Sequence, residues 1–313
     1  MHPKASSRDL KLAVVGVGSL GQHHARILAD TPGVTLIGVV DTSAERAREI
    51  GERHGVPHFT RVEELPPVDG VSLAAPTTLH RELAEHFLRR GVGVLCEKPM
   101  AATVEECDAI LAARDAGKAK LAAGHIEHFN PGVRALAAHV QKPGFLEVHR
   151  LGVFTGRSLD VDVILDLMIH DIEIAQSLVK RPIRSVEAVG VRVLTPFVDL
   201  ANARLTFEGG CVANLTASRI SRDKVRKLRV FQPAAYLAVD YAEQAVDYYR
   251  VESTPAGPTI ASVAVAVEKQ EPLRLELEHF ARVLRGEEEP LVGGEAAREA
   301  VAVAREILTC MTR

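Results

Sequence analysis

Two groups of residues in this sequence could move a proton at a carbon–oxygen bond. Lys98 follows a short apolar run, and Pro99 restricts it to an extended backbone. Asp166 and His170 are four residues apart, so on a helix they lie one turn apart on one face. A carboxylate there would orient the imidazole and favour its protonated form. We predict that His170 accepts a proton, that Asp166 orients it and that Lys98 stabilises negative charge on oxygen.

The segment around His170 favours this interpretation because polar side chains share one stripe of an apolar helix. Asp162 and Glu173 continue the stripe of Asp166 and His170, while the other faces are mostly aliphatic. Such a helix should be largely buried, and buried acids are costly unless they are paired or used. The alternative is an acidic helix start followed by a histidine that is satisfied in the core.

A glycine-rich turn between an apolar run and a helix start predicts a dinucleotide site. Gly16 allows the tight turn, Gly18 lets the backbone approach a pyrophosphate, and Gly21 lets the helix pack on the strand. The pyrophosphate would bind at the helix N-terminus. Asp41 ends the next apolar run, where its carboxylate can accept hydrogen bonds from ribose hydroxyls and would repel a 2′-phosphate. We therefore predict NAD rather than NADP, with Arg46 keeping NADP as the alternative.

The residues expected around the cofactor share positions at the carboxyl ends of predicted strands. They are Gly16, Gly18, Ser19, Leu20, Gly21, Asp41, Thr42, Ala75, Pro76, Thr77, His80, Glu97 and Lys98. The residues expected at the substrate share polar or aromatic character in the segments that follow. They are Lys98, Glu127, Phe129, Asn130, Arg157 and His170. His125 and His128 have a spacing that could suggest a metal site, but no third ligand is evident and we predict none.

Strand and helix signals alternate as far as Gly124 and then change character. Residues 1–124 predict a doubly wound parallel sheet, a Rossmann domain that binds NAD. Residues 125–313 predict an α+β domain for substrate binding and oligomerisation, with a large, mostly antiparallel open sheet. Its last helix is a candidate to pack back on the first domain. The predicted helices cover residues 44–55, 78–90, 103–116, 131–140, 162–178, 273–285 and 295–312. The predicted later strands cover residues 185–194, 201–207, 212–218, 225–231 and 236–240, and 252–267 could be a loop with an edge strand.

Composition restricts the possible partners of this chain. The 313 residues carry a formal charge of −3, which favours neither nucleic acid nor an anionic membrane. No apolar run approaches the length of a membrane span. The four cysteines match no zinc or C-x-x-C pattern, so we expect reduced thiols in a cytoplasmic protein. The expected partners are a small sugar or sugar-nucleotide substrate and further copies of the chain.

These motifs together resemble the Gfo/Idh/MocA oxidoreductases over nearly the whole chain. The resemblance rests on the glycine turn with Asp41, on Pro76 to His80, on Glu97-Lys98-Pro99 and on Asp166-x-x-x-His170-Asp171, and it continues in residues 275–280 and 290–295. It implies a two-domain NAD(P) oxidoreductase acting on sugars, cyclitols or sugar nucleotides. By residue match, Lys98, Asp166 and His170 would be the catalytic set. It also implies a cis Lys98–Pro99 bond and a homodimer or homotetramer formed through the open sheet.

Within that family, residues 124–131 and 166–173 are similar to the UDP-N-acetylglucosamine 3-dehydrogenase subgroup. This likeness implies oxidation of the sugar 3-hydroxyl to a ketone that an aminotransferase can use, in amino-sugar or lipopolysaccharide-type biosynthesis. His128 departs from the subgroup, in which an arginine is usual at that position. The alternatives are a dehydrogenase of myo-inositol or free sugars, and a non-catalytic NAD-binding regulatory protein.

Overall fold

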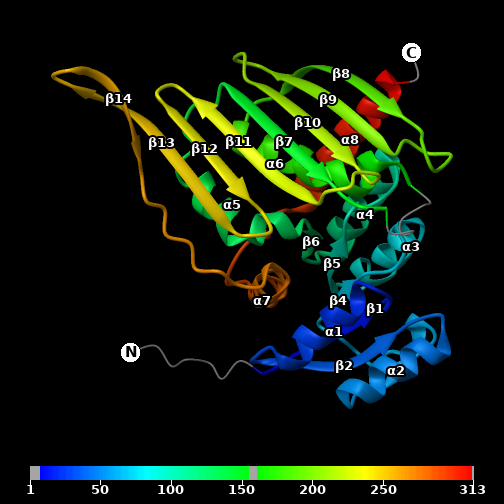
Figure 1. The fold of residues 1–313 in the computed structure, drawn as a ribbon. Helices are drawn as coiled ribbons and strands as arrows, with labels where there is room; N and C mark the ends of the chain where they lie inside the picture. The colour runs from blue at the N-terminus through cyan, green and yellow to red at the C-terminus, as the bar shows by residue number, and fades with distance from the viewer. Residues whose placement is uncertain (1–7, 155–160, 312–313) are drawn as a thin grey trace, which may run out of the picture. The chain divides into compact units, whose positions relative to one another are not determined.

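The computed structural model of the chain describes residues 8–154 and 161–311 (Figure 1). The chain divides into two compact units. The first unit contains the chain up to Gly124 together with Leu273–Arg298. The second unit contains His125–Pro272 together with the chain from Glu299 onward.

The first unit contains a six-stranded parallel sheet in the order β3-β2-β1-β4-β5-β6. Its strands are β1 Leu10–Val15, β2 Val34–Val40, β3 His58–Phe59, β4 Gly70–Leu73, β5 Gly93–Glu97 and β6 Leu121–Gly124. Its helices are α1 Gly21–Asp30, α2 Ala44–His54, η1 Val62–Glu64, α3 Thr77–Leu88, α4 Val104–Gly117 and α7 Pro272–Leu284. This confirms the predicted doubly wound sheet. The strands are almost continuously buried, as expected for a parallel sheet covered on both faces.

Helix α7 follows the strands of the second unit in the sequence, but it packs on the sheet of the first unit. A Cβ on Gly70 would lie 2.7 Å from Leu284 Cδ1, and one on Gly93 would lie 2.2 Å from Leu284 Cδ2. The two glycines therefore leave the space that Leu284 fills. After the helix, the Ala123 N–H donates to the Val292 carbonyl at 3.0 Å, which anchors the returning chain beside β6.

The second unit contains an eight-stranded sheet in the order β14-β13-β12-β11-β7-β10-β9-β8. Its strands are β7 Phe145–Leu151, β8 Ile183–Val191, β9 Leu200–Phe207, β10 Val212–Ser218, β11 Val225–Gln232, β12 Ala235–Asp240, β13 Ala245–Thr254 and β14 Gly257–Ser262. The pairing is antiparallel except between β7 and β10, so the predicted mostly antiparallel sheet is confirmed. Helical segments η2 Ile126–Phe129, α5 Pro131–Ala137, η3 Ile164–Met168, α6 Ile169–Val179 and α8 Gly294–Cys310 complete the chain, and α5 and α6 pack on the sheet (Figure 1).

Strand β7 lies inside this sheet, although the sequence patterns did not indicate it. Its core-facing positions are Leu146, Val148 and Arg150. The third inward residue is an arginine, which interrupts the apolar alternation by which strands are recognised. Residues 252–267, for which we expected a loop with an edge strand, contain the end of β13 at Thr254 and the edge strand β14.

The described residues contain no helix that is both long and apolar enough to cross a bilayer. All four cysteines have free thiols. Burial raises the pKa of the Cys107 thiol to about 12 and that of Cys211 to about 11. A thiol that stays protonated is a poor nucleophile, so these two side chains act as small core residues.

Candidate functional site

The glycine-rich turn between β1 and α1 is a tight loop with one open position. Gly16 has φ +83°, and a Cβ there would lie 2.6 Å from the Ala75 backbone nitrogen. A Cβ on Gly21 would lie 1.8 Å from the Gly16 carbonyl oxygen. A Cβ on Gly18 would meet no described atom within 4 Å. Gly16 and Gly21 are therefore required by the turn itself, whereas Gly18 leaves free space on the side where a ligand can approach.

The surroundings of this turn fit a dinucleotide. Helix α1 begins after Leu20, whose side chain provides no N-cap hydrogen bond. Gln22 N and His23 N donate to the Gly18 and Leu20 carbonyls at 3.3 and 2.9 Å, and the helix N-terminus with its positive dipole faces this turn. The Asp41 carboxylate is fixed in place, because it accepts hydrogen bonds from Val17 N at 3.0 Å and Ser43 N at 2.9 Å. Thr42 lies in the connection that these bonds order. The turn can hold a pyrophosphate, and Asp41 can hold the adenosine ribose.

Arg46 supports the turn from helix α2. Its Nε donates to the Val17 carbonyl at 2.7 Å, and its Nη1 pairs with Glu49 at 2.6 Å. The guanidinium is therefore tied to the glycine loop and to a neighbouring acid.

His80 joins two loops at the carboxyl edge of the sheet. Helix α3 starts at Thr77, with Pro76 at its N-cap, and His80 follows on its first turn. The ring nitrogens lie 2.9 Å from the Pro99 carbonyl and 2.8 Å from the Ala75 carbonyl. Burial lowers the pKa of His80, so a neutral ring donates to one of these two carbonyls. The histidine holds the loop after β4 against the loop after β5.

Glu97 and Lys98 stand at the end of β5. The Lys98–Pro99 bond is cis, as the family resemblance implies. The Glu97 carboxylate accepts a hydrogen bond from Lys98 N at 3.2 Å and lies 3.2 Å from His24 Nε2. Burial acts to raise the pKa of Glu97, but its hydrogen bond to His24 and the charges of His24 and Lys98 outweigh that effect and lower it. Glu97 is therefore a buried carboxylate directly before the lysine.

The helix that carries His170 differs in register from a uniform α-helix. Residues Ile164–Met168 form a π-helical turn before α6 begins at Ile169. Single π-turns inside helices occur frequently at functional sites. Asp162 accepts a hydrogen bond from Val198 N at 2.8 Å, so it anchors a loop. The His170 ring is buried, edge-on to the His125 ring, with 6.0 Å between their centroids.

A buried ionic network crosses the core of the second unit. Arg150 donates to both oxygens of Asp171 at 2.8 and 2.7 Å, and to Glu127 at 2.8 Å. Its guanidinium lies 5.2 Å from the centre of the Tyr241 ring. Burial alone would lower the pKa of Arg150, but the charges of Asp171 and Glu127 raise it well above its ordinary value. The neighbouring pair of His128 and Glu173 joins the η2 segment to α6.

The network occupies polar groups that we expected at the substrate. Glu127 is held by Arg150, while Asn130 accepts from Gly132 N at 3.0 Å and donates to the Tyr241 carbonyl at 2.9 Å. Phe129 is buried beside them. Arg157 lies outside the described residues. Direct substrate contacts of these four residues stay predictions. Within the described ranges, no group of three His, Cys, Asp or Glu side chains is placed to hold a metal ion.

Sequence patterns missed three buried polar residues, His24, Arg150 and Glu276. His24 and Glu276 occupy core positions of amphipathic helices, beside Ala25 and Leu277. A polar residue at a core position of an i, i+3, i+4 pattern was the available signal. Arg150 gave a similar signal at an inward position of β7.

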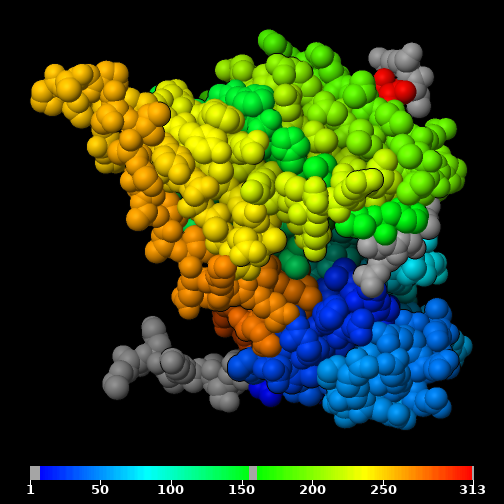
Figure 2. Space-filling view, in the orientation of Figure 1, coloured from blue at the N-terminus to red at the C-terminus, as the bar shows by residue number. Residues whose placement is uncertain are grey.

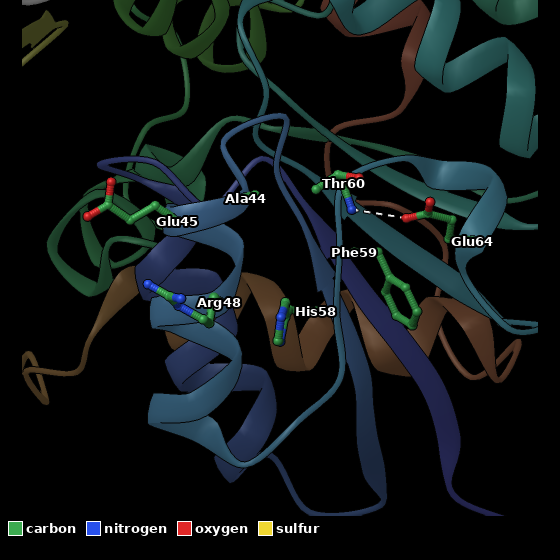
Figure 3. Close-up of a pocket in the computed structure, with 7 residues that line it drawn as sticks. All are labelled: Ala44, Glu45, Arg48, His58, Phe59, Thr60 and Glu64. Carbon is green, nitrogen blue, oxygen red and sulfur yellow. Dashed lines mark hydrogen bonds between the residues drawn. The ribbon is translucent and has the colours of Figure 1, made fainter.

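A surface hollow of about 440 Å³ lies beside helix α2. Figure 3 shows Glu45 and Arg48 on α2 and residues 58–60 on the neighbouring segment, where Thr60 N donates to Glu64 at 3.1 Å. Ala44 completes the lining. None of the predicted cofactor or substrate residues lines this hollow.

Comparisons with known proteins place these features in a family context. Residues 10–125 match a family described as an oxidoreductase family with an NAD-binding Rossmann fold. Residues 109–234 match the GFO/IDH/MocA C-terminal domain.

Individual relatives cover most of the chain. It is 36% identical to UDP-N-acetylglucosamine 3-dehydrogenase of Acidithiobacillus ferrooxidans over 302 residues, which are 95% of this chain and 96% of that protein. A solved structure of that dehydrogenase superposes with a TM-score of 0.90 at 35% identity, covering 96% of this chain and 97% of the other. Scyllo-inositol 2-dehydrogenase (NAD(+)) of Bacillus subtilis is 27% identical over 233 residues, 68% of each chain.

Proposed function

Because the chain belongs to the Gfo/Idh/MocA oxidoreductase family, we propose that it oxidises the 3-hydroxyl of UDP-N-acetylglucosamine to a ketone. It is an NAD(P)-dependent oxidoreductase acting on CH–OH groups. The observation that carries the proposed substrate is the 36% identity to a UDP-N-acetylglucosamine 3-dehydrogenase over 95% of the chain. The ketone would be a substrate for an aminotransferase in amino-sugar biosynthesis.

In the proposed reaction, the protein binds, orients and polarises the sugar hydroxyl. Bound NAD supplies the hydride acceptor. His170 takes the hydroxyl proton, and Asp166 orients the imidazole for that transfer. Lys98 donates a hydrogen bond to the same oxygen and stabilises negative charge there. The buried carboxylate of Glu97 supports this role, because it keeps a negative charge beside the lysine.

The proposed substrate is tested with a panel of alcohols. Purified protein with NAD is given UDP-N-acetylglucosamine, glucose or myo-inositol, and NADH absorbance is followed. We expect NADH with the sugar nucleotide at a kcat/KM well above that of either free polyol. The similarity to scyllo-inositol 2-dehydrogenase is the reason to keep a polyol dehydrogenase as the second candidate. Activity confined to glucose or inositol would establish that candidate instead, and NAD binding without turnover of any alcohol would favour the regulatory alternative.

NAD is the proposed cofactor, in preference to NADP. The Asp41 carboxylate is held by Val17 N and Ser43 N. In this proposal it accepts hydrogen bonds from the ribose hydroxyls and would repel a 2′-phosphate. The nearby cation Arg46 already bonds the glycine loop and Glu49, so pairing with a 2′-phosphate would cost it those bonds.

Asp41→Asn is therefore expected to lower the preference for NAD over NADP by about tenfold or more, about 1.4 kcal/mol. The amide removes the negative charge but keeps a similar shape. The dissociation constants of NADH and NADPH, measured by cofactor fluorescence, give the ratio. Glu45→Gln, which removes an exposed acid in the first turn of α2, is the matched control. An unchanged ratio in Asp41→Asn would contradict the assignment.

The open sheet of the second unit is the proposed surface for a homodimer or homotetramer. Several of its strands expose apolar side chains, which mark association surfaces when they are contiguous. These residues are Val189, Val191, Phe231, Tyr249, Val251 and Ile260. Figure 2 shows the β13–β14 hairpin, in orange, projecting beyond the neighbouring strands of this sheet.

A further inference from the structure

Helix α7 carries an acidic side chain into the core of the first unit. Leu273, Leu277 and Phe280 are buried on this helix, and Glu276 shares their face with only 1% of its surface exposed. Among the described residues, neither oxygen of its carboxyl has a hydrogen-bond partner. An ionised carboxylate in such a place is strongly disfavoured. Burial, followed by the charge of Glu97, raises the pKa of Glu276 well above its ordinary value.

Helix α7 packs against the strand that ends at Glu97. Leu284, eight residues after Glu276, fills the space left by Gly93 at the start of β5. Glu276 and Glu97 are both buried in this unit, and the charge of Glu97 acts on the Glu276 carboxyl.

Glu97 is held on its other sides by polar partners. His24, fully buried on α1, lies 3.2 Å from one carboxylate oxygen and 2.7 Å from the Ser72 hydroxyl. Lys98 N donates to the other oxygen. A Cβ on Gly124 would lie 2.9 Å from the same carboxyl carbon, so the glycine gives Glu97 its space.

We propose that Glu276 holds a proton in this core and is a positioning residue for Lys98, acting through Glu97. Two buried carboxyls whose charges act on each other are disfavoured in the doubly ionised state. With Glu276 neutral, the charge resides on Glu97, where His24 and the Lys98 backbone meet it. An ionised Glu276 would add a second buried negative charge, and this charge would compete with Glu97 for nearby cations. The functional part rests on the role proposed above for Lys98.

The protonated carboxyl has a direct spectroscopic signature. The infrared C=O stretch of a carboxylic acid is distinct from the bands of a carboxylate. We expect this band in the full-length protein at neutral pH and its loss in Glu276→Gln. Glu278→Gln, which changes a partly exposed acid two residues further along α7, should retain it. Absence of the band from the wild-type protein, or its persistence in Glu276→Gln, would overturn the proposal.

The proton should also make stability depend on pH. A carboxyl whose pKa is raised in the folded state contributes stability that is complete below its ordinary value of 4.5 and is lost as pH rises through the folded pKa. The Gln side chain in Glu276→Gln does not ionise, so this pH-dependent loss of stability is absent from the variant. Above pH 4.5 and below the folded-state pKa, the unfolding constant of wild type relative to Glu276→Gln should therefore rise by up to about tenfold per pH unit. A ratio that stays flat with pH, as expected for Glu278→Gln, would contradict a buried proton.

The positioning role has its own readout in cofactor affinity. As Glu276 ionises at alkaline pH, wild type should lose affinity for NADH, measured by cofactor fluorescence, while Glu276→Gln keeps it. Coincident pH profiles of affinity would show that Glu276 does not act on the cofactor end of β5. None of these measurements uses a sugar substrate, so their failure is separate from a failure of the proposed substrate.

Discussion

Replacing His170 with Ala is expected to lower the turnover of UDP-N-acetylglucosamine by about 10²–10⁴-fold. The side chain is the proposed acceptor of the hydroxyl proton, and alanine offers no base in its place. The NADH dissociation constant should stay unchanged, because His170 is not among the residues expected around the cofactor. Steady-state kinetics under NADH absorbance gives the turnover, and fluorescence titration gives the affinity.

The control for this variant is Ser177→Ala on the same helix. That hydroxyl donates to the Ile174 carbonyl one turn back, and its removal should leave turnover near wild type. Equal melting temperatures of the two variants would exclude unfolding as the cause of the His170 effect. Turnover by His170→Ala that matches Ser177→Ala would remove His170 from the proposed reaction.

Replacing Arg150 with Met is expected to destabilise the protein by about 3–5 kcal/mol. The methionine fills much of the same volume, but it leaves Asp171 and Glu127 buried without their cation. A buried carboxylate that loses its partner carries the full cost of its desolvation. The free energy of unfolding, measured by urea titration at neutral pH, gives the difference.

Arg229→Met is the matched control on the adjacent strand β11. Arg229 also pairs with a carboxylate, Glu147 at 2.7 Å, but both side chains are about one-third exposed. Exposed pairs of this kind contribute about 0–1 kcal/mol, so the control should lose little stability. If the two variants lost equal amounts, burial would not be what makes the Arg150 network important.

The sequence was most informative where a local pattern is tied to a local shape. Gly16, Gly21 and Asp41 predicted the dinucleotide turn because their roles are local. The two glycines allow the tight turn and the close packing of the helix, and Asp41 would bind the ribose. The cis bond before Pro99 followed from family likeness. Strand β7 was missed because Arg150 stands where the alternation calls for an apolar side chain. Its partners Glu127 and Asp171 are separated from it in sequence, and only the fold brings them together.

The same limit explains the other buried polar groups. From the sequence, Glu276 had no assigned role within the predicted helix 273–285, and the packing of α7 on the sheet makes it a core residue. The π-turn at Ile164–Met168 also escaped prediction, because uniform helical spacing was assumed from Asp162 onward. Polar residues at core positions of the predicted elements are therefore the sequence feature that would have indicated these buried polar groups.

The most direct measurement follows one hydrogen atom of the substrate. UDP-N-acetylglucosamine carrying deuterium on carbon 3 of the sugar is incubated with the protein and NAD, and the reduced cofactor is analysed by mass spectrometry and NMR. Oxidation of the 3-hydroxyl predicts deuterium on the nicotinamide C4 of the NADH formed. NADH that contains no deuterium, formed from a sugar that keeps its label, would contradict oxidation at that position.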